Sequence, residues 1–214
     1  MEKFKNIIRN IYPVSDSSIN LLLPHIKKKT YRKNDFIIKA GEIRHEVYFI
    51  CEGLISMNFI HNNEEYVAGI YKKNECVPSS MSFYKEEESH AFTLIPIKDS
   101  SLYVLSKDSM QKLYREDREI AYLIITMADY LFIKSVKVNI LLKCYSPINR
   151  YKSIQEEFSD TLNDIPIKTF ASLIGITDTS LSRIRNQLTK EKMAHKKKET
   201  NSLLRKKESN NFST

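Results

Sequence analysis

The chain has 214 residues, of which 42% are hydrophobic, and a formal net charge of +8 at neutral pH. This apolar content suffices for one large or two small folded domains, but no apolar run approaches the ~18 residues that a membrane-spanning helix needs. Cys51, Cys76 and Cys144 are far apart in the sequence, which argues against a disulfide framework, a metal site or an iron–sulfur cluster. The sequence MEKFKNIIRNIYPV at the start is charged and lacks a signal-peptide apolar region. We therefore expect a cytoplasmic protein with no membrane contact.

The first hundred residues predict two helical segments followed by β-strands. The helices are expected at residues 3–11 and 17–26, before runs rich in β-branched and aromatic residues begin. Asn-, Asp- and Gly-containing turns separate these runs at about the 8–12-residue spacing of all-β folds. The expected strands cover residues 36–38, 47–50, 54–60, 66–71 and 101–105. Residues 1–117 are therefore predicted to form an antiparallel jelly-roll barrel or sandwich.

A long helix is predicted over residues 118–144. Apolar residues recur there at alternating steps of four and three, the heptad spacing of a coiled-coil seam, and only Lys134 interrupts it. Such a helix packs against its own barrel, but a seam sustained over about three heptads also favours a parallel homodimer. The expected interface residues are Ile120, Ile124, Met127, Leu131 and Val138.

Residues 165–188 have the pattern of two short helices joined by a sharp turn. Pro166 suits the start of the first helix, because its missing N–H has no partner there in any case. Gly175 suits the left-handed conformation in which helices often end, and Thr177 suits the N-cap of the second helix. This layout is that of a helix-turn-helix, and an ordinary solvated helical hairpin is the alternative.

The second of these helices is predicted to have one buried and one outward face. Leu181, Ile184 and Leu188 share the buried face at helical spacing. Hydrogen-bonding side chains, which fit the edges of bases in a DNA major groove, occupy the other positions. The expected DNA-binding residues are Thr179, Ser180, Ser182, Arg183 and Asn186, with Lys168 on the first helix.

The positive charge is concentrated beyond this motif. Residues 145–189 carry five basic and five acidic residues, whereas residues 190–214 carry eight Lys/Arg against three Glu, a net of +5. The polar composition of residues 190–214 predicts a mobile tail. Such a tail attracts DNA phosphates without regard to sequence or simply solubilises the protein, and composition is compatible with both roles.

The order of barrel, long helix and helix-turn-helix resembles the Crp/Fnr family of bacterial transcription regulators over residues 10–190. The most specific parts are residues 33–42 (KNDFIIKAGE) and 47–53 (VYFICEG), which are similar to the first strands of a cyclic-nucleotide-binding domain. Residues 146–151 (SPINRY) and the motif after them are similar to the winged-helix half. The resemblance implies an α+β fold: a barrel effector domain (1–117), a long dimerisation helix (118–144), a winged helix-turn-helix (145–189) and a basic tail (190–214).

The same resemblance implies a homodimer that presents two recognition helices to a pseudo-palindromic site on double-stranded DNA. As an activator it would also contact RNA polymerase, and as a repressor it would not need to. Cyclic-nucleotide binders of the family carry a Gly-Glu pair for the ribose and an Arg for the cyclic phosphate. Residues 77–80 (VPSS) and 89–91 (SHA) lack all three, so cyclic AMP is not expected to bind in the usual way. The residues left to contact another effector are Ser79, Ser80, Ser89 and His90.

No other cofactor is expected. No cysteine precedes Cys51, where the family's oxygen sensors hold an iron–sulfur cluster, and the five histidines are scattered without a haem motif. Nucleophile elbows, metal clusters and paired catalytic carboxylates are also missing from the sequence, so we expect no enzymatic activity. The leading interpretation is a homodimeric, sequence-specific DNA-binding transcription regulator. The alternative, favoured by the neutral charge of residues 145–189, is a sensor or interaction module that acts through protein contacts.

Overall fold

The computed structural model describes residues 2–42, 45–77 and 92–211, with only the backbone described from residue 195 onward. The N-terminal part begins with the helices α1 (Glu2–Ile11), α2 (Asp16–Leu22) and η1 (Leu23–His25). The strands are β1 (Lys27–Tyr31), β2 (Glu46–Glu52), β3 (Leu54–His61), β4 (Glu64–Lys72), β5 (Cys76–Val77), β6 (Thr93–Pro96) and β7 (Ser100–Ser106). The helices that follow are α3 (Lys107–Glu116), α4 (Arg118–Cys144), α5 (Pro147–Glu157), η2 (Leu162–Asp164), α6 (Ile167–Leu173) and α7 (Asp178–Asn211).

The strands form two antiparallel sheets, with the orders β1-β7-β2-β5 and β4-β3-β6. Successive side chains of β2 point to opposite faces of its sheet. Tyr48 and Ile50 join the apolar cluster between the two sheets, whereas Phe49 and Cys51 join the cluster under the helices. Burial on both faces explains why β2 has an unbroken apolar sequence. The predicted antiparallel barrel and α+β class are confirmed.

Three strands were not predicted from the sequence. β1 has the polar sequence KKKTY and exists through its pairing with β7, and β5 and β6 are only two and four residues long. Residues 36–38, predicted as a strand, form only one isolated bridge, between Ile38 and Leu94. Pairing partners far away in the sequence decide such short elements, because local β-propensity is weak.

The predicted turns are confirmed by backbone conformation. Asn34, Asn62, Asn63 and Asn74 have φ angles of 66°, 52°, 63° and 70°, the left-handed region that asparagine tolerates better than most residues. The consecutive pair Asn62–Asn63 joins β3 to β4, where a two-residue hairpin turn requires positive φ at both positions.

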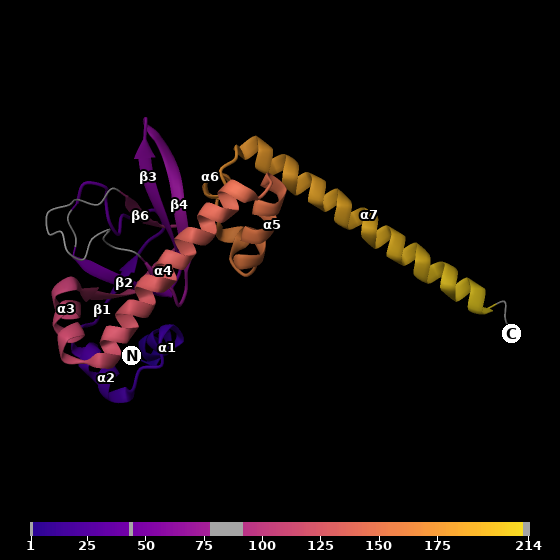
Figure 1. Cartoon of the computed structure of the whole chain (residues 1–214). Helices are drawn as coiled ribbons and strands as arrows, with labels where there is room; N and C mark the ends of the chain where they lie inside the picture. Colours follow the sequence, from indigo (N-terminus) through magenta and orange to yellow (C-terminus); the bar gives the residue numbers. More distant parts are fainter. Residues whose placement is uncertain (1, 43–44, 78–91, 212–214) are drawn as a thin grey trace.

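Helix α4 runs from the N-terminal helices, past the barrel, to α5 and α6 (Figure 1). The Asp117 carboxylate accepts a hydrogen bond of 2.9 Å from the Ile120 N–H and so caps the start of α4. Ile120 and Met127 are 0% and 5% exposed and lie in the core cluster that α1 shares with the barrel. Two side chains buried within one protomer cannot form a dimer seam, so the predicted interface is wrong at these positions. The heptad pattern identified an apolar stripe, but this stripe packs on the chain's own barrel.

The C-terminal helices pack against β3 and β4. An apolar cluster joins Leu54 and Ile70 of the barrel to Phe158, Phe170 and Ile174 of the helices. The Ser172 hydroxyl accepts a 2.9 Å hydrogen bond from the Val67 N–H, and Lys98 forms a 2.6 Å ion pair with Asp164. The barrel and the C-terminal helices therefore share one core and several polar contacts.

Helix α7 differs from the prediction in length. Residues 190–211, predicted to be a mobile tail, continue α7 as one helix that projects away from the rest of the chain (Figure 1). From Ile176 to Asn211 the sequence contains neither glycine nor proline, the two residues least favourable inside a helix, and lysine is its most frequent residue. Residues 145–211 contain no strand, so the wing that the family resemblance implied is not formed. None of the helices in the described part of the chain has the length and apolarity to cross a membrane.

Candidate nucleic-acid interface

The turn between α6 and α7 has the geometry predicted from its glycine. Gly175 has a φ of 65°. The Gly175 N–H bonds to the Ser172 carbonyl at 3.1 Å, and the Ile176 N–H bonds to the Ala171 carbonyl at 3.0 Å. These two bonds form a Schellman motif, which ends α6 and turns the chain sharply.

Arg150 holds this turn in place. Its guanidinium donates hydrogen bonds to the carbonyls of Leu142, Tyr145 and Ile174, at 2.6, 2.9 and 3.2 Å. These carbonyls lie at the ends of α4 and α6, where backbone acceptors lack partners within the helix. Arg150 therefore links the end of α4 to the end of α6 and helps to fix the orientation of the two-helix motif relative to α4. The sequence placed Arg150 in the stretch SPINRY (residues 146–151), but nothing local indicates that its side chain reaches three carbonyls.

The start of α7 is capped as the sequence predicts. The Thr177 hydroxyl accepts a 3.2 Å hydrogen bond from the Ser180 N–H and lies 2.9 Å from the Ser180 hydroxyl. Leu181 and Ile184 are buried against α5 and α6, so the rotation of α7 is set by its apolar face. Ser180 belongs to this cap and is half-buried, and is thus less available to a ligand than predicted.

The opposite face of α7 is exposed. Arg183 forms no ion pair or hydrogen bond with any described residue, so its guanidinium is available to a partner. The side chains predicted to contact DNA that are exposed here are Thr179, Ser182, Arg183 and Asn186, together with Lys168 on α6. Exposure is what the prediction requires, and the contact with DNA stays a prediction.

The basic residues of this region divide into two groups. Arg150 binds carbonyls, and Arg185 lies over the rings of Tyr151 and Phe170, 5.9 and 5.6 Å from their centroids. The exposed basic residues of the 145–189 segment are Lys152, Lys168 and Arg183. Its surface is therefore less basic than its composition indicates.

An apolar stripe on α4 faces solvent. The outward residues recur at helical spacing opposite the buried Ile120 and Met127. Phe132 is 69% exposed and Ile125 is 47% exposed. The other exposed apolar residues of this stripe are Tyr122, Ile133, Val136 and Ile140. Of the remaining predicted interface residues, Ile124, Leu131 and Val138 are half-buried, on the side of α4 that faces the barrel and α5.

The predicted effector residues Ser79, Ser80, Ser89 and His90 lie outside the described residues. In the described part of the chain, no three His, Cys, Asp or Glu side chains are grouped to hold a metal ion. Cys51 and Cys76 are buried free thiols, whereas Cys144 is exposed. Burial raises the pKa of the Cys76 thiol to about 12, which keeps it protonated and unreactive at neutral pH.

Comparison with known proteins agrees with this architecture. Residues 28–117 match the family profile of the cyclic nucleotide-binding domain. The structure of FixK2 from Bradyrhizobium japonicum is similar over 78% of this chain and 85% of its own, with a TM-score of 0.69 and 17% identity. The chain has the Crp/Fnr fold. No curated protein sequence matches it.

Two further structures extend the likeness to the Crp/Fnr fold. CLP of Xanthomonas campestris, a global regulator responsive to c-di-GMP, is 15% identical and has a TM-score of 0.66, with 83% of this chain and 93% of its own covered. A protein of Eubacterium rectale described as a Crp/Fnr transcriptional regulator is 13% identical, with a TM-score of 0.65 and coverage of 85% and 88%. The resemblance inferred from the sequence is confirmed for the fold, and function has to be argued from this chain's own residues.

Proposed function

We propose that this chain is a homodimeric, sequence-specific DNA-binding transcription regulator without enzymatic activity. The observation that carries this proposal is the exposed hydrogen-bonding face of α7, around Thr179, Arg183 and Asn186. Leu181 and Ile184 fix the opposite face on the core, and the Gly175 turn fixes the start of the helix. A rigidly held helix end with free donors and acceptors fits a major groove, where each base pair presents a distinct hydrogen-bonding pattern.

The outward stripe of α4 supports the dimer. A row of exposed apolar side chains that includes Phe132 and Ile125 runs along a helix of 27 residues. Exposed apolar side chains gathered on one helix face mostly mark an interface, and only the exposed Asp129 interrupts this row in the described part of the helix. Pairing of two α4 helices through this outer stripe would place two α7 helices about a two-fold axis, as a pseudo-palindromic operator requires.

The barrel is the proposed effector domain. Residues 77–80 and 89–91, at the positions of the family's ligand-binding motif, lack the glycine, glutamate and arginine with which its cyclic-nucleotide binders hold their ligand. We therefore propose that it does not bind cyclic AMP in the usual way. Whether the protein activates, and then contacts RNA polymerase, or represses depends on where its operators lie.

Selection of bound sites from random duplex DNA tests this function. The expected result is enrichment of a pseudo-palindrome whose half-sites are about one helical turn, ~10 base pairs, apart. Enrichment of a single half-site would contradict the dimer, and no enrichment over random DNA would contradict sequence-specific binding.

A protein-contact module is the second candidate, because only Lys152, Lys168 and Arg183 expose positive charge between residues 145 and 189. A gel shift with the selected site and with random duplex, with and without residues 195–214, separates the two functions. A regulator keeps a preferred site after truncation, whereas a protein-contact module loses all DNA binding with the basic segment.

A further inference from the structure

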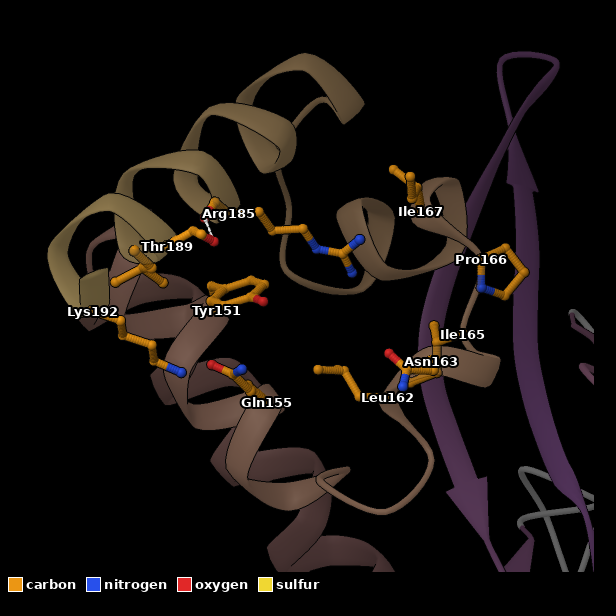
Figure 2. Close-up of a pocket in the computed structure, with 11 residues that line it drawn as sticks. Tyr151, Gln155, Leu162, Asn163, Ile165, Pro166, Ile167, Arg185, Thr189 and Lys192 are labelled. Atoms are coloured by element: carbon orange, nitrogen blue, oxygen red, sulfur yellow. Dashed lines mark hydrogen bonds between the residues drawn. The ribbon is translucent and has the colours of Figure 1, made fainter. Parts of the chain in front are cut away.

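A pocket of about 560 Å³ lies between α5, α6 and α7 (Figure 2). Leu162, Ile165 and Leu188 are among the apolar residues that line it. Its polar lining comes from Tyr151, Gln155, Asn163, Arg185, Thr189 and Lys192. The lining includes two cations and no carboxylate, so the pocket carries a net positive charge.

Arg185 is the central feature of this pocket. Its side chain is half-buried and lies over the rings of Tyr151 and Phe170. Among the described residues, no carboxylate or carbonyl accepts a hydrogen bond from its guanidinium. The two rings attract the guanidinium as a cation and keep it beside them. Its N–H donors remain free for an oxyanion, which a guanidinium binds through two parallel hydrogen bonds.

Other donors line the same pocket. In Figure 2 the Arg185 side chain extends toward α6, Lys192 and Gln155 lie on the other side of the Tyr151 ring, and Asn163 lies beside Leu162. Lys192 is seven residues from Arg185, which places both side chains on the same face of α7. Two cations and two amides suit a group with more than one negative charge and several acceptor oxygens.

The pocket opens away from the groove-reading face of α7. Arg183 and Arg185 are two residues apart and so point in directions about 200° apart around the helix axis. Arg183 is exposed, whereas Arg185 turns toward α5 and α6. A ligand in the pocket is thus compatible with α7 lying in a groove, and it would contact the elements that hold α7 in place.

We propose that this pocket binds a phosphate group, with Arg185 as the bidentate anchor and Lys192 as the second charge. Phosphate is favoured over carboxylate because a phosphomonoester carries about 1.5 to 2 negative charges and three acceptor oxygens at neutral pH. A free phosphate ester and a DNA backbone phosphate share this chemistry. The site is separate from the barrel and does not depend on the proposed DNA binding.

Titration calorimetry of the full chain with inorganic phosphate and pyrophosphate, at constant ionic strength, tests the proposal. We expect saturable pyrophosphate binding that weakens at least tenfold in Arg185→Gln and severalfold in Lys192→Ala. Lys190→Ala is the matched control, because it removes the same charge from the same helix outside the pocket lining. It should bind like the unmodified chain.

Arg185→Lys covers the risk that the glutamine variant unfolds. It keeps the charge but loses the planar fork, so weaker binding by a folded Arg185→Lys protein supports the bidentate anchor. Two outcomes would overturn the proposal: no saturable binding of either anion at ~10 mM, or equal weakening in Lys190→Ala and Lys192→Ala.

A competition arm identifies the source of the phosphate. The pyrophosphate titration is repeated with the protein saturated by duplex DNA. Displacement of pyrophosphate assigns the pocket to a backbone phosphate, and unchanged affinity assigns it to a free phosphate ester. If the protein binds no DNA, the proposed function as a regulator fails. The titration of the free protein still shows whether the pocket binds phosphate.

Discussion

At the scale of single residues, Arg183 and Arg185 show how position on a helix decides the use of a side chain. They are two residues apart on α7, yet Arg183 is exposed and Arg185 lies beside the rings of Tyr151 and Phe170. The burial of Leu181 and Ile184 orients both. Arg183 is therefore available to read a base, while Arg185 contributes to the core of the motif and to its pocket.

Arg183→Ala is expected to flatten the base preference at one position in each half-site. A bidentate arginine–guanine pair contributes about 1–3 kcal/mol of discrimination against other bases. Binding to random DNA should fall much less than binding to the selected site, as measured by titration with both duplexes. Lys152→Ala, another exposed cation of the same unit, is the control. Equal losses on both duplexes would make Arg183 a phosphate contact.

At the scale of elements, the two faces of α4 have different surroundings. Its inner face packs on α1 and the barrel, and Lys134, the residue that interrupts the heptads, forms a 2.8 Å ion pair with Glu75 there. The Tyr130 hydroxyl donates to the same carboxylate at 2.9 Å, and the Lys134 ammonium lies 4.6 Å from the centroid of the Tyr71 ring. Lys134 thus interrupts the apolar pattern at the point where α4 contacts Glu75, in the turn before β5. Its outer face is apolar and exposed.

The double variant Ile125→Asp, Phe132→Asp is expected to be monomeric by light scattering. Burial of apolar area yields roughly 25 cal/mol per Å², and two buried carboxylates would oppose it strongly. Because both side chains are exposed in one chain, the monomer should keep its fold, as circular dichroism can check. Ser135→Asp, an exposed residue on the flank of α4, should stay dimeric. A dimer that survives the double change would place the interface on another surface.

Removal of the distal part of α7 is expected to weaken the salt dependence of DNA binding. Residues 195–214 carry six Lys/Arg against two Glu, a net of +4. Each phosphate contact contributes about 0.9 to the slope of log K against log salt. Truncation after Ala194 should lower the magnitude of that slope and leave the selected site sequence unchanged. An unchanged slope would mean that this segment does not touch DNA, and a changed site would mean that it reads a groove.

At the scale of the whole molecule, the C-terminal helices and the barrel share a core. Leu54 and Ile70 of the barrel pack in the same cluster as Phe170, and the Val67 N–H donates to the Ser172 hydroxyl on α6. The barrel and the helices α6 and α7 are therefore in direct contact, so a movement in one would be felt by the other.

Cyclic AMP is expected to leave the melting temperature of the chain unchanged. A ligand present at 100 times its dissociation constant stabilises the folded state by about 2.7 kcal/mol, which a thermal-shift measurement detects. The sequence of the barrel lacks the residues that would hold the ribose and the cyclic phosphate. A saturable shift at micromolar cyclic AMP would contradict this expectation.

Features of the fold that depend on local interactions could be predicted from the sequence. Gly175, Thr177 and Leu181 act within one turn of chain, so the hinge, the cap and the buried face of α7 were predicted correctly. The exposure of Arg183 follows from the same periodicity. The strands β2 and β3 were also predicted, because they are rich in the apolar, β-branched and aromatic residues that buried strands favour.

Tertiary structure decided the rest, because a pattern of apolar residues states that a face is buried but not what covers it. The stripe through Ile120 and Met127 packs on the barrel of its own chain. Only this contact shows that a second apolar stripe, on the opposite face of α4, is left exposed. The short strands β1, β5 and β6 depend on partners distant in the sequence. The pocket around Arg185 exists because three helices converge there, a juxtaposition that only the folded chain creates.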